Sequence, residues 1–209
     1  MSASVMQASH PESLRIALDI LRRGGLVAFP TDTVYGVGAM AFDVAAVERI
    51  YAAKRRDSTK ALPILLADRS SLPEVADELS PDARRLAETF WPGPLTIVVN
   101  RRSAVPDAVS LGTTVGVRVP AHPVALELLH ASGPLATTSA NPSGAPDPMT
   151  ADDVAAGLGD AIDLILDGGR SPGGRPSTVV DCTVSPPILV REGPISMDLI
   201  LAVLGKAEC

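Results

Sequence analysis

Hydrophobic positions along the chain recur at two spacings, one typical of amphipathic helices and one typical of short buried strands. Residues 11–23 show the helical spacing after a proline that suits a first turn, and two glycines then end the pattern. Residues 26–29 form an apolar run that Pro30 ends, and a polar loop over residues 31–38 follows. The chain therefore begins with a helix and a buried strand.

The same two patterns continue to the C-terminus. Asp43 is a candidate cap for a helix over residues 44–51, and Ser80 opens a helix that runs toward Phe90. Thr150 and Asp153 approximate a capping box, with Asp where Glu is usual. Further helices are predicted over residues 124–130, after position 150 and over 197–204. Further strands are predicted over residues 62–66, 95–99, 115–119, 135–137, 164–166, 178–181 and 188–191.

The order of these elements predicts an α/β fold with a mixed sheet. Several strands are separated by loops too short to hold a crossover helix, so an all-parallel sheet is excluded. No repeat and no long linker divides the chain, which indicates a single domain. The loops over residues 142–148 and 168–176 are candidates for cleft walls or lids.

Composition narrows the possible functions. A chain of 209 residues with 46% hydrophobic and 20% charged residues has the composition of a globular protein. Aromatic residues make up only 3%, so stacking platforms for single-stranded nucleic acid are scarce. The formal net charge of -6 opposes binding to a polyphosphate backbone. Both observations argue against a dedicated nucleic-acid-binding protein, but local basic clusters could still form a positive cleft.

Cysteine and histidine give no sign of a metal site or of a disulfide framework. Cys182 and Cys209 are the two cysteines, and neither is spaced from a partner as zinc ligands are. The three histidines form no ligand pair, so we expect no protein-bound metal. No stretch approaches the roughly 20 apolar residues of a membrane span. A soluble protein of the reducing cytoplasm fits these observations best.

The nucleotide-binding loops that are easiest to recognise are absent. There is no Gly-x-x-x-x-Gly-Lys-Ser/Thr loop, and residues 36–38 lack the third glycine of a dinucleotide fingerprint. Any ATP site must therefore use separate cations and hydroxyl groups.

Several polar segments could supply them, and each also has a purely structural interpretation. Residues 30–36 place two hydroxyls, a carboxylate and a phenol after a strand, or form an ordinary capped turn. Residues 54–60 could grip a triphosphate, or form a solvated helix end. Arg118, between apolar neighbours, needs an anion, which could be a ligand or an internal carboxylate. Residues 137–144 place hydroxyls and an amide past a strand, as a phosphate site or as a turn.

Together and in order, these segments resemble the YrdC family over about residues 12–195. The motifs that carry the resemblance are Pro30 to Gly36, Lys54 with Arg56, residues 91–96 (Trp-Pro-Gly-Pro-Leu-Thr), residues 116–120 (Gly-Val-Arg-Val-Pro), residues 139–141 (Ser-Ala-Asn) and residues 177–181 (Ser-Thr-Val-Val-Asp). The resemblance implies a single twisted mixed sheet flanked by helices around a basic concave cavity. It also implies an L-threonylcarbamoyladenylate synthase, a nucleotidyltransferase that uses L-threonine, bicarbonate and ATP.

The resemblance assigns roles to particular residues. Lys54 and Arg56 would be catalytic, stabilising charge on the phosphates, with Mg²⁺ accompanying ATP and no metal bound by the protein itself. The ATP-binding set would be Lys54, Arg56, Lys60, Thr114, Ser139, Asn141 and Arg191. The threonine-binding set would be Thr33, Arg118, Thr137 and Ser177, with Arg118 pairing with the substrate carboxylate. Arg170 and Arg175 are candidate lid residues.

Two positions depart from the family pattern, Lys60-Ala61 where many relatives have Asn-Pro, and Leu65 where a histidine is frequent. They concern the contacts to threonine and leave the reaction class unchanged. We expect residues 12–195 to form the catalytic domain and 196–209 to form a C-terminal helix and tail of the same domain. The chain resembles the short form of the family, because longer relatives carry a second C-terminal domain.

The product implied by the resemblance is a precursor of threonylcarbamoyladenosine in tRNA, so downstream transferase machinery would be a partner and tRNA contact is possible. The main alternative is a non-catalytic RNA-binding or ribosome-maturation module of the same fold. A second alternative is a carbamoyl-adenylate enzyme that modifies a partner protein, as in larger hydrogenase-maturation proteins. Both alternatives are disfavoured by the sequence, the first by acidic charge and few aromatics, the second by the missing companion domains.

Overall fold

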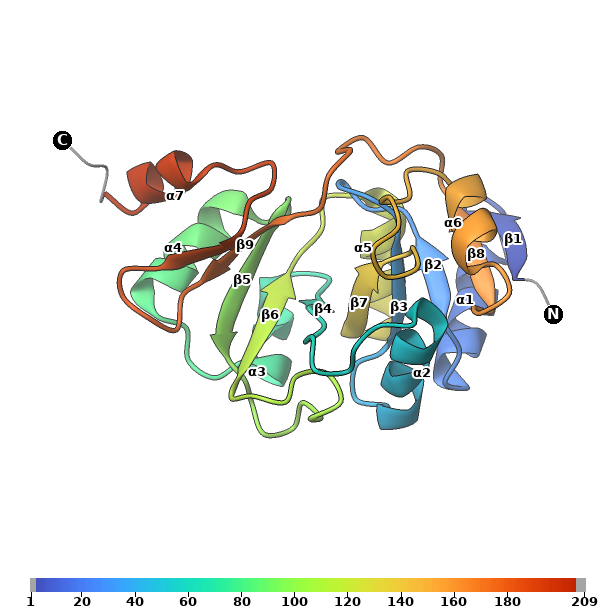
Figure 1. Ribbon diagram of the computed structural model, residues 1–209, viewed down its shortest axis with the longest axis horizontal. Helices are drawn as coiled ribbons and strands as arrows, with labels where there is room; N and C mark the ends of the chain where they lie inside the picture. The colour runs from blue at the N-terminus through green and yellow to red at the C-terminus, as the bar shows by residue number, and fades with distance from the viewer. Residues whose placement is uncertain (1–2, 206–209) are drawn as a thin grey trace.

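The computed structural model describes residues 3–205 and shows one α/β domain built on a strongly twisted mixed sheet (Figure 1). The strand order is β1-β8-β2-β3-β7-β4-β6-β5-β9-β10. Four neighbouring pairs are parallel, β1–β8, β2–β8, β4–β6 and β5–β9, and the other pairs are antiparallel. The predicted single domain with a mixed sheet is confirmed.

The elements have the following bounds. The strands are β1 (Ser4–Gln7), β2 (Val27–Phe29), β3 (Gly36–Met40), β4 (Ile64–Leu65), β5 (Leu95–Asn100), β6 (Thr114–Arg118), β7 (Leu135–Ser139), β8 (Leu164–Asp167), β9 (Thr178–Asp181) and β10 (Ile188–Arg191). The helices are α1 (Ser13–Arg22), α2 (Val44–Lys54), α3 (Leu72–Val75), α4 (Pro81–Phe90), α5 (Pro123–Ser132), α6 (Ala151–Leu158) and α7 (Met197–Val203), with a 3₁₀ turn at Arg69–Ser71.

One half of the sheet is covered by helices on both faces. In β2, Val27 and Phe29 pack with α1 and α5, whereas Ala28 between them packs in the cluster that contains α2 and α6. Successive side chains of a strand point to opposite faces, so an entirely apolar β2 is the expected sequence for this position. Figure 1 shows α2 and α6 on one side of these strands and α1 and α5 on the other.

The other half of the sheet is covered on one face only. In β5, Leu95 and Ile97 belong to the large hydrophobic cluster that includes Leu86 of α4. The alternate residue Thr96 lines a pocket instead, together with residues of β6, β7 and β9. The strands between the two halves therefore carry polar residues on a face that no helix fills, and this face is where the candidate site lies.

Every helix and strand predicted from the hydrophobic pattern is present, within a few residues at each end. Asp43 accepts a hydrogen bond from the Ala46 amide, and Thr150 and Asp153 form both bonds of the capping box. The pattern missed β1, β3 and the short α3 with its preceding turn. The loop expected over residues 31–38 is wrong at its end, because β3 begins at Gly36.

Within residues 3–205, every helix is too short or too polar to cross a bilayer. Residues 206–209, the end of the predicted C-terminal tail, lie outside the described part of the chain, and so does Cys209.

Candidate functional site

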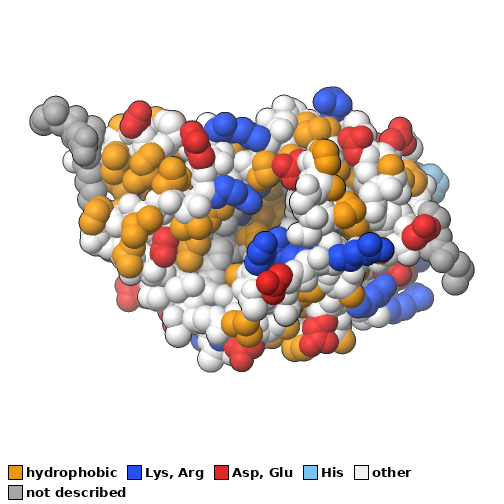
Figure 2. Space-filling view, viewed as in Figure 1, with side chains coloured by type: hydrophobic (Ala, Val, Ile, Leu, Met, Phe, Trp, Pro, Cys, Tyr) orange, Lys and Arg blue, Asp and Glu red, His pale blue; other side chains and the backbone are white. Residues whose placement is uncertain are grey.

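A cavity of about 340 Å³ opens on the uncovered face of the sheet. Its walls come from the loop after β2, the segment after α2, and the strands β4 to β7, β9 and β10. Figure 2 shows the surface hollowed in the middle of the molecule, with Lys and Arg side chains around the hollow. Segments that are far apart in sequence therefore meet around one cavity of a size typical for small-molecule sites.

The lining of the cavity carries positive charge and hydroxyl groups. Arg56, Arg118 and Arg191 are its charged members, and no carboxylate belongs to the lining among the described residues. The hydroxyl-bearing members are Thr31, Thr33, Thr96, Thr137, Thr138, Ser139 and Ser177. Arg118 is ion-paired with Asp32, which lies outside the lining, whereas Arg56 and Arg191 form no ion pair within the described part of the chain. The guanidinium groups can therefore attract an anionic ligand, and the hydroxyls can orient it.

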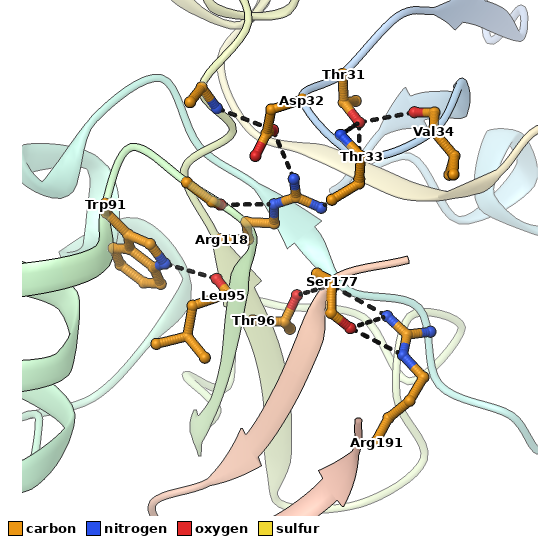
Figure 3. A network of polar contacts seen from close by, with 12 residues as sticks. Thr31, Asp32, Thr33, Val34, Trp91, Leu95, Thr96, Arg118, Ser177 and Arg191 are labelled. Atoms are coloured by element: carbon orange, nitrogen blue, oxygen red, sulfur yellow. Dashed lines mark hydrogen bonds and ion pairs between the residues drawn. The ribbon is translucent and has the colours of Figure 1, made fainter. Parts of the chain in front are cut away.

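Arg118 at the end of β6 is buried and held at three of its nitrogen atoms (Figure 3). Nη2 lies 2.6 Å from Oδ1 of Asp32, Nη1 donates to Oγ1 of Thr33 at 3.0 Å, and Nε donates to the Gly93 carbonyl at 3.0 Å. Burial lowers the pKa of Arg118, and the ion pair with Asp32 opposes that effect. Two of the five guanidinium N–H groups remain available to a ligand.

The threonines after β2 form a directed chain of hydrogen bonds. Thr31 Oγ1 donates to the Val34 carbonyl at 2.7 Å, so the 2.9 Å bond between the two threonine hydroxyls must be donated by Thr33. Thr33 in turn accepts from Arg118. Each hydroxyl proton of this chain is thereby assigned, and the loop is fixed against the guanidinium.

On the opposite wall, Arg191 of β10 holds the residue that precedes β9. Nε and Nη2 of Arg191 donate to the carbonyl of Ser177 at 3.0 and 2.9 Å, and Nη2 also lies 3.0 Å from Ser177 Oγ. Ser177 Oγ is 2.8 Å from Thr96 Oγ1 (Figure 3). Burial lowers the pKa of Arg191, nearby Asp147 raises it, and Arg56 lowers it. The Nη1 group points to no acceptor within the described residues, so it is free to bind a ligand.

Lys54, the last residue of α2, lies beside the cavity and is 2% exposed. Its ammonium group donates to the carbonyls of Ser139 and Asn141 and to Oδ1 of Asn141 at 3.2 Å. Three acceptors occupy its three protons. Burial, and secondarily the charge of Arg56, lowers the pKa of Lys54 to about 8.

Ser139 and Asn141 complete this arrangement at the end of β7. Ser139 Oγ donates to Oδ1 of Asn141 at 2.6 Å, and Nδ2 of Asn141 donates to the Ala145 carbonyl at 2.6 Å. Asn141 is therefore bonded internally, whereas Ser139 faces the cavity with its oxygen able to accept. Lys54 and Asn141 fix the turn that presents Ser139.

Arg56 lies in the segment after α2, and its side chain forms only long hydrogen bonds. Nε is 3.4 Å from the Lys60 carbonyl and Nη2 is 3.3 Å from the Ala61 carbonyl. The backbone before it turns at Arg55, which adopts φ 52° and ends the helix. A weakly held guanidinium at the cavity mouth can move to meet an anionic ligand.

The structure brings most of the residues predicted for the site around the cavity. The lining includes Thr33, Arg56, Arg118, Thr137, Ser139, Ser177 and Arg191. Lys54 and Asn141 lie directly behind Ser139. Thr114, at the far end of β6, does not belong to the lining, and exposed Lys60 meets its neighbours through its carbonyl. Both departures from the family pattern reach the cavity, because Ala61 and Leu65 belong to its lining.

Sequence reasoning gave no role to two residues that the geometry makes important. Asp32 is the counter-ion of Arg118, and Thr96 is the partner of Ser177. The signal for Thr96 was a hydroxyl on the same alternation that marks Arg118, a polar residue among apolar neighbours in a predicted strand. No comparable signal existed for Asp32, because aspartate is routine in turns.

The loop over residues 168–176, a predicted lid, is anchored at its start. The hydroxyl of buried Tyr35 donates to the Gly169 carbonyl at 2.6 Å and accepts from the Gly168 amide at 3.3 Å. Burial, more than any other effect, raises the pKa of Tyr35 to about 12, so the phenol keeps its proton. Later in the loop, the Gly174 amide donates to the Thr33 carbonyl at 3.2 Å.

No group of three or more His, Cys, Asp or Glu side chains within residues 3–205 is arranged to bind a metal ion. The cavity itself offers hydroxyl oxygens and no carboxylate over the described range. A divalent cation that enters with a phosphate ligand would therefore depend on the phosphates for its charged ligands.

Comparison with known proteins shows that the chain is similar in sequence to proteins named threonylcarbamoyl-AMP synthase. A threonylcarbamoyl-AMP synthase of Pyrococcus abyssi is 45% identical over 195 residues, which are 92% of this chain and 57% of the relative. A putative threonylcarbamoyl-AMP synthase of Mycobacterium tuberculosis is 40% identical over 190 residues, covering 90% of this chain and 88% of the relative. The chain thus spans little more than half the length of the archaeal relative.

A solved structure agrees with these relatives. The crystal structure of P. abyssi Sua5 complexed with L-threonine superposes with a TM-score of 0.93 at 42% identity, covering 99% of this chain and 62% of that chain. The family model of Sua5, YciO and YrdC, described as telomere recombination, matches residues 19–193. These residues include every segment that lines the cavity, and the chain belongs to the Sua5/YciO/YrdC family.

Proposed function

We propose that the protein is an L-threonylcarbamoyladenylate synthase that converts L-threonine, bicarbonate and ATP to threonylcarbamoyl-AMP, pyrophosphate and water. The observation that carries the proposal is the single cavity in which Arg56, Arg118 and Arg191 converge with a ring of hydroxyls. The names of the relatives support an enzyme over a non-catalytic RNA-binding module.

The threonine side of the cavity is the buried end around Arg118. The two unoccupied N–H groups of Arg118 can bind a carboxylate, while Asp32 and Thr33 hold the guanidinium in place. The other residues that we assign to threonine binding are Thr33, Thr137 and Ser177, which all line the cavity. A crystal structure of a family member contains L-threonine, which supports an amino-acid site in this fold.

The ATP side is the more exposed end, where Arg56 and Arg191 lie. Both guanidinium groups have N–H groups without close acceptors, so they can bind phosphate oxygens, with Ser139 as a further contact. Lys60 and Thr114 remain weaker candidates, since neither lines the cavity. We assign Lys54 and Asn141 to positioning Ser139, because all three protons of the lysine are bonded to the protein.

The reaction follows from this placement. The amine of threonine attacks the carbon of bicarbonate and water leaves, which gives an N-carboxy-threonine. One oxygen of its new carboxylate attacks the α-phosphorus of ATP, the bond to the β-phosphate oxygen breaks, and pyrophosphate leaves. The arginines stabilise the charge that grows on the phosphates, and the sheet excludes water from one side of the labile product.

Mg²⁺ accompanies ATP in this proposal and neutralises part of the triphosphate charge when bound. The cavity offers hydroxyls and no carboxylate over the described range, so the nucleotide would carry the ion and the protein would not hold it alone. The adenylate would pass to downstream transferase machinery that modifies tRNA. This protein could also contact tRNA directly. We propose a cytoplasmic location, where these partners act.

The test is to incubate the protein with L-threonine, bicarbonate, ATP and Mg²⁺, and to measure pyrophosphate and threonylcarbamoyl-AMP by mass spectrometry. We expect pyrophosphate release that requires threonine. Arg118→Ala should raise KM for threonine, whereas Arg56→Ala should raise KM for ATP. Pyrophosphate release that is independent of threonine, or absent, contradicts the proposal.

A further inference from the structure

A second cavity, of about 470 Å³, lies between α3, the start of α4 and the chain that follows β5. Its volume is in the range of ligand sites, and it shares no lining residue with the cavity of the candidate active site. Figure 1 shows α3 and α4 in the half of the molecule that contains β5 and β9. A ligand in this second cavity would leave the candidate active site free.

Three arginines from separate segments line the second cavity, Arg69 in the 3₁₀ turn, Arg84 in α4 and Arg102 after β5. All three are exposed, and none forms an ion pair within residues 3–205. Asp77 and Glu78 belong to the same lining, and they are not paired with the arginines either. Guanidinium groups that lack an internal counter-ion can bind an anionic group of a partner.

Arg102 is anchored on one side of its guanidinium group. Nη1 donates to the Pro73 carbonyl at 2.5 Å, and the Arg102 amide donates to the Val75 carbonyl at 3.0 Å. One of five guanidinium N–H groups is used in this way, and the other four have no acceptor among the described residues. Neighbouring Arg101 differs, because it forms an ion pair with Asp107. Arg102 is therefore held in place with donors available to a partner.

Arg84 lies in the first turn of α4, where its charge does not stabilise its own helix. The N-terminal end of a helix carries a partial positive charge, so anions are preferred there. Glu88 lies one turn further along α4 and forms no ion pair with Arg84 in the described part of the chain. An external anion therefore explains the position of Arg84 better than the stability of α4 does.

The floor of the second cavity is apolar, and the cavity continues into a neighbouring one. Leu72 and Ala76 are buried and Leu79 is half-buried, which offers a seat for one apolar side chain. The segment 78–79 also borders a third cavity, of about 330 Å³, which extends to Asn100. We call the two adjoining cavities the α3–α4 groove. An occupant that fills both must be longer than a single side chain.

Asn100 favours a peptide over a small anion as the occupant of the groove. Its residue is exposed, and its side-chain amide forms no hydrogen bond within the described range, while its carbonyl accepts from the Asp77 amide at 3.0 Å. A side-chain amide carries a donor and an acceptor, as a peptide group does, so it can pair with the main chain of an extended segment. A small anion would use the arginines alone, whereas a peptide can also use the apolar floor and this amide.

We propose that the α3–α4 groove binds an extended acidic segment of a partner protein. Its carboxylates pair with Arg69, Arg84 and Arg102, one apolar side chain lies on the floor, and its main chain bonds to Asn100. Nucleic acid fits less well, because Asp77 and Glu78 in the groove and the net charge of -6 repel a continuous row of phosphates. The inference goes beyond the proposed function and does not depend on it, since the groove lies outside the candidate active site.

The experiment selects peptides from a displayed library of random sequences on the wild-type protein, with ATP present to occupy the candidate active site. We expect the selected sequences to carry Asp or Glu beside one large apolar residue. The most enriched peptide is synthesised, and its Kd is measured by fluorescence polarisation with wild type, Arg84→Glu and Arg102→Glu. Each substitution should raise the Kd about tenfold or more, because it replaces an attraction by a repulsion.

Matched variants separate the groove from general charge effects. Arg22→Glu makes the same charge change at an exposed position of α1 and should leave the Kd of the peptide unchanged. Glu78→Gln removes a carboxylate from the groove and should lower the Kd about twofold. Melting temperatures and threonine-dependent pyrophosphate release should equal those of wild type in Arg84→Glu and Arg102→Glu, which shows that the variants are folded.

The outcomes distinguish the occupants. Selected peptides without acidic residues, or a Kd that Arg84→Glu and Arg102→Glu leave unchanged, overturn the inference. An equal loss of binding in Arg22→Glu also overturns it, because the attraction would then be a general effect of charge. Concentration-dependent dimers that Arg102→Glu abolishes would identify a second copy of the chain as the occupant instead of a partner. Absence of pyrophosphate release by wild type, with peptide binding intact, contradicts the proposed function alone.

Discussion

At the scale of single residues, the site depends on buried charges that the protein has already paired. Arg118 is 5% exposed, and its ion pair with Asp32 has side chains that are 7% and 11% exposed. A guanidinium in such surroundings is costly unless each partner is in place. The pairing makes Arg118 rigid, and rigidity lets its two remaining N–H groups select one orientation of a carboxylate.

Asp32→Asn should therefore both destabilise the protein and weaken threonine binding. The amide keeps the shape of the side chain but removes the charge opposite Arg118, and breaking a buried pair costs about 3 kcal/mol. We expect the loss in urea-unfolding free energy together with a higher KM for threonine and a KM for ATP that changes little.

Glu12→Gln is the matched control, because it removes one carboxylate charge from the exposed pair with Arg15, whose side chains are 61% and 51% exposed. Its effect on the unfolding free energy should stay below about 0.5 kcal/mol. Equal effects of the two substitutions would show that Asp32 is not held in a special environment.

The lowered pKa of Lys54 should make the free energy of unfolding rise with pH in the alkaline range. Its pKa is about 8 in the folded protein, below the ordinary value of 10.5. Between these values the unfolded chain binds more protons than the native protein, so this group makes stability rise with pH. Below about pH 8 the cost of burying the ammonium is present in full, and above about pH 10.5 it is gone.

The measurement is the difference in unfolding free energy between wild type and Lys54→Met across this range. The difference should change in favour of wild type by about 3 kcal/mol from pH 8 to pH 10.5, as expected for a shift of this size. Subtracting the variant removes the titration of other groups. A difference that is flat with pH would mean that the native pKa is not lowered.

At the scale of elements, hydrophobic periodicity predicted the helices and most strands because each has one dominant spacing. It failed at β3, whose sequence Gly36–Met40 mixes two glycines with valine, alanine and methionine and has no polar alternation. The strand is central and four of its five residues are buried, so its two faces do not differ in polarity and the alternation that marks a strand is missing. It failed at β1 for the opposite reason, since this edge strand is four residues long and mostly exposed.

The absence of a side chain at Gly116 leaves space on the cavity face of β6, and filling that space should weaken ligand binding. Gly116→Ala adds a methyl group 3.1 Å from Thr96 Cγ2, and the neighbour must shift slightly to accept it. We expect threonine binding to weaken about tenfold, measured by calorimetry, because the methyl group occupies space beside Arg118 and the Thr96–Ser177 pair. The unfolding free energy should fall by less than about 1.5 kcal/mol.

Gly112→Ala controls for the loss of glycine at the other end of the same segment. Its Cβ would meet only the Thr114 amide nitrogen, at 4.0 Å, so threonine binding should equal that of wild type. If both alanines weaken binding alike, the effect comes from backbone flexibility and not from the volume of the cavity.

At the scale of the whole molecule, the sequence predicted which residues lie together around the cavity. It did not predict which of them bind other protein groups and which remain available to a ligand. The ordered motifs indicated correctly that Arg56, Arg118, Ser139 and Ser177 lie together. They could not show that the ammonium group of Lys54 donates all three of its protons to protein acceptors, because that depends on the path of the turn after β7. They also could not pair Arg118 with Asp32, which is 86 residues away in sequence.

The distribution of charge over the molecule indicates that salt should affect ATP binding and threonine binding differently. The chain has a formal net charge of -6, yet the cavity is lined by three arginines and no carboxylate in the described residues. Arg56 and Arg191 lie toward solvent, so salt should screen their attraction for ATP, whereas Arg118 is buried and should be screened much less.

Raising potassium chloride from about 0.1 M to about 1 M shortens the screening length from roughly 10 Å to roughly 3 Å. We expect the Kd of ATP to rise about tenfold and the Kd of threonine to change less than about twofold, both measured by calorimetry. Arg56→Gln should flatten the salt dependence of ATP binding, whereas Arg22→Gln, the same loss of charge at an exposed position of α1, should not. Equal salt dependence of ATP and threonine would show that the two ligands do not occupy the differently exposed ends of the cavity proposed for them.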